Sequence, residues 1–241
     1  MSHPTWHCGK NGFFALRSRS MKSSQTVRHD IVNLLCDFLQ VWIHQILYRR
    51  QLYPHGIFVL RKKYSVPVYM SNNPEVNQYI AQFVLTLRPM LEKGDCKSVS
   101  VVVTTATQRP LERFVLEIDS IIRTLDVPLD KLLASEATEP LADFEQYLRA
   151  CLLKMAACDT ILQRNPPHCR FWFSIEMTDE GPPSGQGTGP DVDWIPAEPD
   201  VSSDAFAWAN LIPLKTIPMD LFKINTYVLE ASKKGKQAAL D

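Results

Sequence analysis

The chain has 241 residues, of which 45% are hydrophobic and 22% charged, a composition typical of one generous globular domain or two small ones. Lys plus Arg and Asp plus Glu each number 26, so the formal net charge is zero. This balance excludes a global field that would draw the protein onto nucleic acid or an anionic membrane. Any DNA contact must be local or made through a partner.

The six cysteines lie far apart along the chain, and no two of them form a CxxC pair. Because the N-terminus carries no plausible secretory signal peptide, we expect reduced thiols in a nuclear or cytosolic protein. His3, His7 and Cys8 lie close together in sequence but offer no convincing fourth ligand. No metal is expected there.

Residues 1–24 are predicted to form a disordered N-terminal extension. Residues 1–29 contain no Asp or Glu but carry five Lys and Arg residues, a bias that weakly resembles a mitochondrial presequence. The simpler interpretation is a disordered segment or an upstream start, with Met21 as an alternative initiator.

Helical spacing of apolar residues begins at Thr26 and predicts a long helix that ends before Pro54. Its most apolar run, residues 31–48, is interrupted by polar residues, which favours a buried amphipathic helix over a membrane span. Extended chain follows. Pro74 then opens a second helix, which Gly94 closes.

A β-hairpin, a third helix and a further strand come next. The runs 98–105 and 111–118 are β-branched and apolar, and a short polar link separates them, which predicts the hairpin. An apolar stripe over roughly Pro140 to Gln163 predicts the helix. The segment "CRFWFSIEM" (169–177) predicts the strand.

The segment "TDEGPPSGQGTGP", residues 178–190, has four glycines and three prolines, and we predict a flexible connector. Beyond it, "ANLIPLKTI" and "DLFKINTYVLEA" regain strand character before a basic tail. Together the elements predict an α+β fold with three helices packed on a mainly antiparallel sheet. The core, about 25–177, looks complete by itself, so a C-terminal segment on this tether could detach and dock again.

The sequence contains no constellation typical of an active site. The glycines of the connector do not form a dinucleotide site, because no strand directly precedes them and Pro190 follows. His44 lies on an otherwise apolar helix and is expected to be a hydrogen-bonded core or boundary residue, and Cys151 and Cys158 are expected to pack as small apolar side chains. We therefore predict a protein that is not an enzyme and uses no cofactor or metal.

A basic run, near Arg49 and Arg50, is formed by Arg61, Lys62 and Lys63. Such a run could contact a nucleic-acid backbone, although a solvated face is the usual role of so short a cluster. The zero net charge of the chain favours the solvated face.

Two aromatic residues stand out by their surroundings. Tyr64 comes directly before "SVPV", where its ring could supply a flat face for proline rings or simply cover a sheet edge. Trp194 lies in "PDVDWIPAEPD", whose prolines and acids can hardly sustain a helix or a central strand. So large a ring needs something to pack against, either within this chain or on a partner.

The chain closely resembles the Mad-two-like HORMA proteins, the Rev-seven-type regulatory subunits of translesion DNA polymerase zeta. The resemblance runs from about Thr26 to Lys234. The segments that carry it, in chain order, are "LLCDFLQVWIHQILYRRQLYPHGIF", "RKKYSVPVYMSNNPEVNQYI", "RPLERFVLEI", "LLKMAACDTILQRNPPHC" and "LIPLKT".

This resemblance implies a HORMA domain over residues 25–235, with a C-terminal safety belt at about 191–235 and a short tail, 236–241. In this family the belt wraps around an extended peptide of a partner. The two aromatic residues that clamp the partner's prolines fall on Tyr64 and Trp194.

The resemblance also implies two further surfaces. Leu211 and Tyr227 correspond to the family's binding surface for the C-terminal domain of the scaffold polymerase Rev-one, while Asn225 stands where the vertebrate pattern has glutamine and has a shorter reach. Arg149 corresponds to the family's dimerisation arginine, with Lys154 nearby. The alternative for these two is a solvated helix face.

The sequence departs from the family at several points. Residues 1–24 have no counterpart, and Pro196 follows Trp194 closely where a non-proline residue is expected. Because proline lacks an N–H donor, a belt strand should be interrupted there or lie on an edge.

The function implied by the resemblance is that of a non-enzymatic adaptor in translesion synthesis. It would capture a proline-containing peptide of the polymerase zeta catalytic subunit and bridge it to Rev-one, mainly in the nucleus, with the cytoplasm and spindle as further locations. Shieldin subunits, anaphase-promoting-complex activators, a belt-opening AAA+ ATPase and a second HORMA copy are further implied partners. DNA would be reached only through partners, and no membrane is involved.

Two alternatives to this adaptor stay open. One is a HORMA protein specialised for the spindle checkpoint. The other is a direct nucleic-acid binder that uses Arg61, Lys62 and Lys63.

Overall fold

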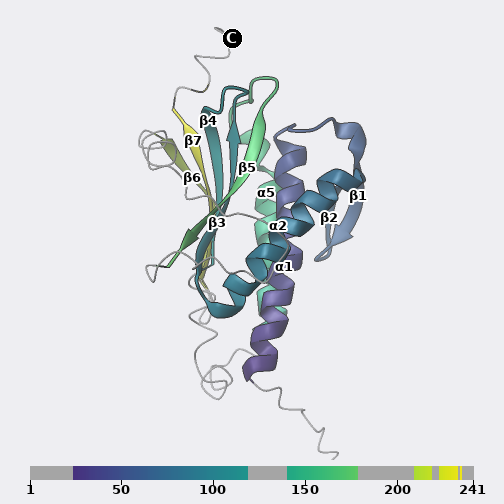
Figure 1. Ribbon diagram of the computed structural model, residues 1–241, viewed down its shortest axis with the longest axis vertical. Helices are drawn as coiled ribbons and strands as arrows, with labels where there is room; N and C mark the ends of the chain where they lie inside the picture. Colours follow the sequence, from purple (N-terminus) through teal and green to yellow (C-terminus); the bar gives the residue numbers. More distant parts are fainter. Residues whose placement is uncertain (1–23, 119–139, 179–208, 219–222, 233, 235–241) are drawn as a thin grey trace, which may run out of the picture.

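The computed structural model describes residues 24–118, 140–178, 209–218, 223–232 and 234. Within these ranges, three helices lie on one face of a five-stranded antiparallel sheet, and a separate two-stranded hairpin lies on the far side of the helices (Figure 1). The α+β fold predicted from the sequence is therefore confirmed. The predicted extension, most of the connector, Trp194, Pro196 and the tail lie outside the described residues.

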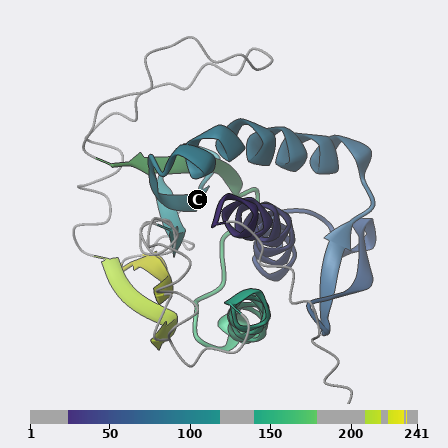
Figure 2. The same ribbon diagram turned by 90° about the horizontal axis from the view of Figure 1, so that it is seen from below.

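Helix α1 (Ser24–Arg49) is the centre of the fold, with α2, α5, the sheet and the small hairpin arranged around it (Figure 2). Its surroundings explain why apolar residues occur on all sides of it. The segment Arg28–Arg49 is long and apolar enough to cross a membrane, but 72% of its most apolar 18-residue window is buried inside the protein. This burial agrees with the predicted core helix.

Helix α2 (Pro74–Lys93) begins and ends at the residues that the sequence predicted. The Asn73 side chain accepts hydrogen bonds from the N–H groups of Glu75 at 2.9 Å and Val76 at 3.3 Å, which satisfies two free donors of the first turn. At the other end, Gly94 has φ 85°, a left-handed conformation that glycine adopts without steric cost.

Helix α5 (Pro140–Ala156) is shorter than the predicted helix, which extended to Gln163. After Ala156 the chain tightens into the 3-10 helix η2 (Cys158–Thr160). Cys158 and Leu162 are still buried, so the apolar spacing continues although the helix has ended. The prediction followed this spacing and was wrong at the C-terminal end of the helix.

The five-stranded sheet has the order β5-β3-β4-β7-β6, and all neighbours are antiparallel. Its strands are β3 (Cys96–Thr104), β4 (Pro110–Glu117), β5 (Arg170–Met177), β6 (Ala209–Pro218) and β7 (Lys223–Ala231). The predicted hairpin of β3 and β4 is confirmed. Because β7 pairs with β4, the two C-terminal strands continue the sheet of the core.

The small hairpin consists of β1 (Phe58–Lys63) and β2 (Val66–Ser71), preceded by the 3-10 helix η1 (His55–Ile57). Its two-residue turn is Tyr64 and Ser65, with φ values of 49° and 58°. Positive φ at both central residues is the geometry of tight hairpin turns, which normally use Asn or Gly there.

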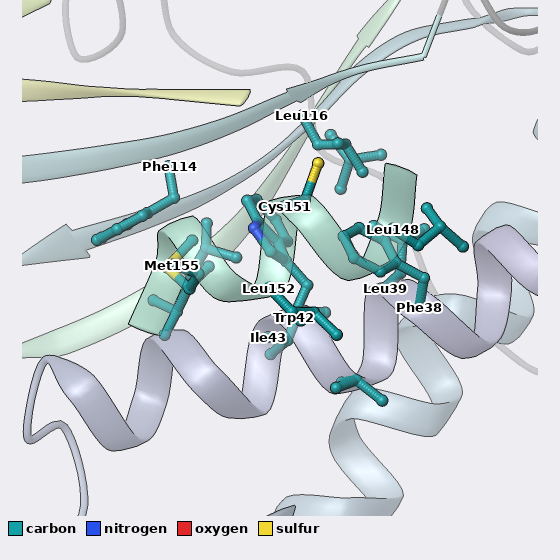
Figure 3. Packing of buried hydrophobic residues seen from close by; sticks show 14 of the residues in the cluster. Phe38, Leu39, Trp42, Ile43, Phe114, Leu116, Leu148, Cys151, Leu152 and Met155 are labelled. Atoms are coloured by element: carbon teal, nitrogen blue, oxygen red, sulfur yellow. The ribbon is translucent and has the colours of Figure 1, made fainter. Parts of the chain in front are cut away.

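The core lies between α1, α5 and the inner face of the sheet. Figure 3 shows side chains of α1 and α5 meeting Phe114 and Leu116 of β4. Trp42, Phe38 and Phe114 are fully buried. Each such side chain contributes roughly 1.5–3 kcal/mol by leaving water. Cys151 and Cys158 are buried among these residues, as the sequence predicted.

Candidate functional sites on the edges and faces of the sheet

Tyr64 is held in a strained turn by contacts with α1. Its hydroxyl donates a hydrogen bond to the Leu34 carbonyl at 3.2 Å, and its ring meets the ring of Phe38 edge-on at 6.3 Å. Burial, with smaller effects of Asp37 and Glu145, raises the pKa of Tyr64. A left-handed conformation costs a non-glycine residue about 1–2 kcal/mol, and such strain is often found at functional sites. Tyr64 is therefore a rigidly placed aromatic residue that is still partly exposed.

The basic run of β1 is exposed, but its predicted neighbours do not join it. Arg61, Lys62 and Lys63 are exposed on the strand. Arg50 is buried and hydrogen-bonded to Glu112, and Arg49 lies 3.5 Å from Asp159 in an ion pair. The run is thus limited to three residues, which weakens the case for a nucleic-acid interface.

The strand β5 forms one edge of the sheet, since β3 is its sole partner among the described strands. Phe171 and Phe173, on the inner face of β5, are only partly buried. The ring of Tyr79 on α2 stacks on Phe173 at 5.2 Å, and the ring of Tyr53 meets Phe171 edge-on at 6.1 Å. These four side chains form an aromatic cluster beside a strand edge, and Tyr79 is 46% exposed.

Sequence reasoning missed this aromatic cluster. The segment "CRFWFSIEM" predicted a strand, and Tyr79 lay within a helical pattern, so neither segment indicated the other. The available signal was the run of three consecutive aromatic residues in β5, Phe171 to Phe173.

Leu211, Asn225 and Tyr227 lie on the outer face of the β6–β7 hairpin. Leu211 is 60% exposed and is directly opposite Leu229 on β7. Successive side chains of a strand alternate between faces, and Thr226 and Val228 are buried, so Asn225, Tyr227 and Leu229 point outward. The structure therefore brings the three predicted residues to one face.

Within that face, Asn225 is already engaged by its own sheet. Its Nδ2 donates a hydrogen bond to Glu117 Oε2 at 2.5 Å, across the paired strands β7 and β4. Burial, and then the Glu117 carboxylate, raises the pKa of Tyr227. The shorter side chain at position 225 is thus directed to Glu117, whereas Leu211 stands free for a contact.

Arg149 and Lys154 are both exposed on α5. Leu153, which is four residues after Arg149 and therefore on the same side of the helix, is 52% exposed. An exposed apolar side chain next to an exposed arginine is typical of a surface that contacts another protein. A solvated helix face would show the same exposure.

A family model described as the HORMA domain matches residues 32–138 of the chain. Human mitotic spindle assembly checkpoint protein MAD2B is 40% identical over 208 residues, which cover 85% of this chain and 93% of that protein. The chain belongs to the HORMA-domain family. The DNA polymerase zeta processivity subunit of Schizosaccharomyces pombe is 30% identical over 152 residues, covering 63% of this chain and 70% of that protein.

Solved HORMA structures share the fold at low sequence identity. A chain of the mitotic checkpoint complex has a TM-score of 0.60 and 20% identity, and covers 83% of this chain and 97% of its own length. Caenorhabditis elegans HTP-2 bound to a HIM-3 closure motif has a TM-score of 0.61 and 14% identity, covering 85% and 92%. These matches establish the HORMA fold of the chain.

Family membership identifies this HORMA protein as an adaptor rather than an enzyme, as predicted. His44 is a hydrogen-bonded core residue, as the sequence predicted. It is 4% exposed, and its Nδ1 accepts a hydrogen bond from the Ser71 N–H at 3.4 Å. Burial lowers the pKa of His44 to about 4. Burial also raises the pKa of the thiols of Cys96 and Cys158 to about 12, so both are protonated and unreactive at neutral pH. No group of three or more metal-ligating side chains occurs in the described part of the chain.

Proposed function

We propose that this HORMA protein is the regulatory subunit of a DNA polymerase zeta and captures a proline-containing peptide of the catalytic subunit. The name of the fission yeast relative supports the polymerase, and the closure motif bound by HTP-2 supports capture of a peptide. The single observation that carries the proposal is the edge of β5, which has an aromatic cluster beside it.

An extended peptide would add to β5 as a further strand. Main-chain hydrogen bonds to the edge would provide affinity, and alternate side chains would face the inner side of the sheet. There they would meet Tyr79, Phe171 and Phe173, whose rings can cover apolar or proline side chains. Tyr64, in the β1–β2 turn of the core, and Trp194, in the predicted belt, are proposed to clamp the prolines.

The second partner would bind at the other end of the same sheet. Leu211 lies on β6, four strands away from β5, which corresponds to roughly 19 Å at about 4.8 Å for each step between strands. A peptide on β5 and the Rev-one domain on the β6–β7 hairpin would therefore not compete for space. This separation is what an adaptor in the nucleus needs in order to bridge a catalytic subunit and a scaffold.

A mitotic role is the second candidate, since the human relative is named a mitotic spindle assembly checkpoint protein. Shieldin subunits, activators of the anaphase-promoting complex, an AAA+ ATPase and a homodimer through Arg149 and Lys154 belong to the same proposal. Each of these partners would use the peptide site, the hairpin face or α5.

Calorimetric titration of a proline-containing peptide from the catalytic subunit tests the proposal. Tyr64→Ala, Trp194→Ala and Tyr79→Ala should each weaken binding by about 2 kcal/mol, the usual contribution of a buried aromatic anchor. Leu211→Ala, on the opposite edge, serves as the matched control and should bind the peptide like the wild type. If all four variants bound the peptide with the affinity of the wild type, the proposed peptide site would be refuted.

Titration of labelled single- and double-stranded DNA at near-physiological salt tests the nucleic-acid alternative. The adaptor proposal predicts weak binding. Tight binding that falls steeply with added salt, and that is lost in the triple variant of Arg61, Lys62 and Lys63 to Ala, would favour direct DNA recognition instead.

A further inference from the structure

Four charged side chains meet in the interior where the C-terminal strand β7 lies against the core. They are Arg50, which follows α1, Glu112 on β4, Glu230 on β7 and Lys234 just beyond β7. The exposed fraction of each side chain is 5% or less. The two cations and two anions of this buried charge cluster balance one another. At its border the partly exposed Asp159 carboxylate lies 3.2 Å from Arg50 and 3.5 Å from Arg49.

The strand register places the two carboxylates of the cluster side by side. Glu112 is the direct partner of Glu230 in the pairing of β4 with β7, and both are buried. Like charges directly opposite on a sheet repel one another, and the repulsion is stronger away from water. Strand β7 can therefore pair in this register only if cations accompany the carboxylates.

Lys234 supplies a cation that contacts both carboxylates. Its Nζ donates hydrogen bonds to Glu112 Oε1 and, at 3.0 Å, to Glu230 Oε1. A third hydrogen bond reaches the Gln163 carbonyl at 2.9 Å. All three donors of the ammonium group are thus used, so Lys234 is fully satisfied only when β7 lies on the core.

Arg50 supplies the second cation, from the core. Its guanidinium makes a bidentate contact with Glu112, with Nε 2.9 Å from Oε2 and Nη2 2.6 Å from Oε1. Asn165 Nδ2 donates a further hydrogen bond to Glu112 Oε2 at 3.1 Å. Glu112 therefore keeps a complete set of partners even without the C-terminal segment.

The cluster consists of two neutral halves. Arg50 and Glu112 belong to the core, and Glu230 and Lys234 belong to the C-terminal segment, where they are four residues apart. When the two halves separate, each buried charge keeps its partner within its own half. Separation therefore avoids the large cost of a buried charge without a partner. The contacts between the halves are the two from Lys234 to the core and the Gln163 N–H donating to Glu230 Oε1 at 2.9 Å.

We propose that this cluster is a latch that holds the β6–β7 hairpin on β4, with Lys234 as the positioning residue. The hydrophobic contact of the hairpin with α5 and the sheet would attract it to the core, and the latch would fix its register and permit release without a stranded charge. The inference rests on the proposed function for its purpose, since release of the hairpin would let a belt open around a peptide. Docking of the β6–β7 hairpin on β4 itself requires no peptide.

Hydrogen–deuterium exchange of the full chain without peptide tests the latch. Lys234→Met leaves one cation for two opposed carboxylates, and should accelerate amide exchange in residues 225–230 by at least about tenfold while α1 and β3 exchange as in the wild type. The double variant Glu230→Gln/Lys234→Met is neutral again and should return exchange to within about threefold of the wild type.

Lys97→Met is the matched control. Lys97 lies 2.7 Å from Glu176 in an ion pair between β3 and β5 of the same sheet, and both side chains are about half exposed, unlike those of the charge cluster. Unchanged exchange in Lys234→Met, equal acceleration throughout the chain, or a double variant as fast as the single one would overturn the latch. If Lys234→Met does not fold, a folded and protected double variant supports the latch and an unfolded one overturns it. Because no peptide is present, failure of the proposed peptide capture would leave these results unchanged.

Discussion

Replacement of His44 by Gln should make the protein less sensitive to mild acid. His44 is buried on α1, and its Nδ1 accepts the N–H of Ser71. A protonated ring carries hydrogens on both nitrogens, so it could not accept this N–H, and its charge would lie among apolar side chains. Burial accordingly lowers the pKa of His44 from 6.5 to about 4.

The size of the stability change that His44 causes on acidification follows from proton linkage. Because the pKa of His44 is lower in the folded state, the unfolded state binds more protons between about pH 6.5 and pH 4, and stability falls as the pH falls through this window. With these two pKa values, His44 should lower the free energy of unfolding by about 2 kcal/mol between pH 7.5 and pH 5.

Urea unfolding at pH 7.5 and pH 5 measures the effect. The loss of stability on acidification should be about 2 kcal/mol smaller for His44→Gln than for the wild type. His29→Gln, an exposed histidine on the same helix, is the control and should respond to pH like the wild type. If wild type and His44→Gln lose equal stability, the reasoning from burial is wrong.

Three further predictions concern the turn, the hairpin face and α5. Ser65→Gly should raise the free energy of unfolding by roughly 0.5–1 kcal/mol in urea titrations, because glycine adopts φ 58° without strain; a decrease would show that the turn is not strained. Leu211→Ala and Tyr227→Ala should each weaken binding of the Rev-one domain in calorimetry and leave peptide capture unchanged, whereas loss of both activities would indicate a misfolded hairpin. Arg149→Ala should be monomeric in sedimentation velocity at concentrations where the wild type forms dimers, and a persistent dimer would rule out this α5 contact.

The elements that the sequence predicted well are those with local chemical signals. Pro74 and Gly94 mark the two ends of α2 through a fixed φ and a left-handed residue, and both act within a few residues. The C-terminal end of α5 was mispredicted because Cys158 and Leu162 keep the apolar spacing after the helix has become a tighter turn. The spacing of apolar residues shows which side chains are buried, and after Ala156 these two side chains stay buried although the chain is no longer an α-helix.

The candidate sites depend on contacts between distant parts of the chain, which no local pattern carries. Leu211 and Tyr227 could be named from the family resemblance, but their common face depends on a register that shifts between Pro213 and Lys215. Arg50 looked like part of a basic patch, although it is 62 residues from its partner Glu112 in sequence and buried with it. This contact depends on how the end of α1 lies against β4, which spacing in the sequence does not report.

If one chain bridges two partners at opposite edges of one sheet, both partners should bind at the same time, which a competition titration measures. The Rev-one C-terminal domain is titrated by calorimetry into the free chain and into the chain saturated with the proline-containing peptide of the catalytic subunit. We expect the same 1:1 stoichiometry and an affinity that changes by less than about threefold between the two titrations. Loss of Rev-one binding in the presence of saturating peptide would contradict an adaptor with two separate sites.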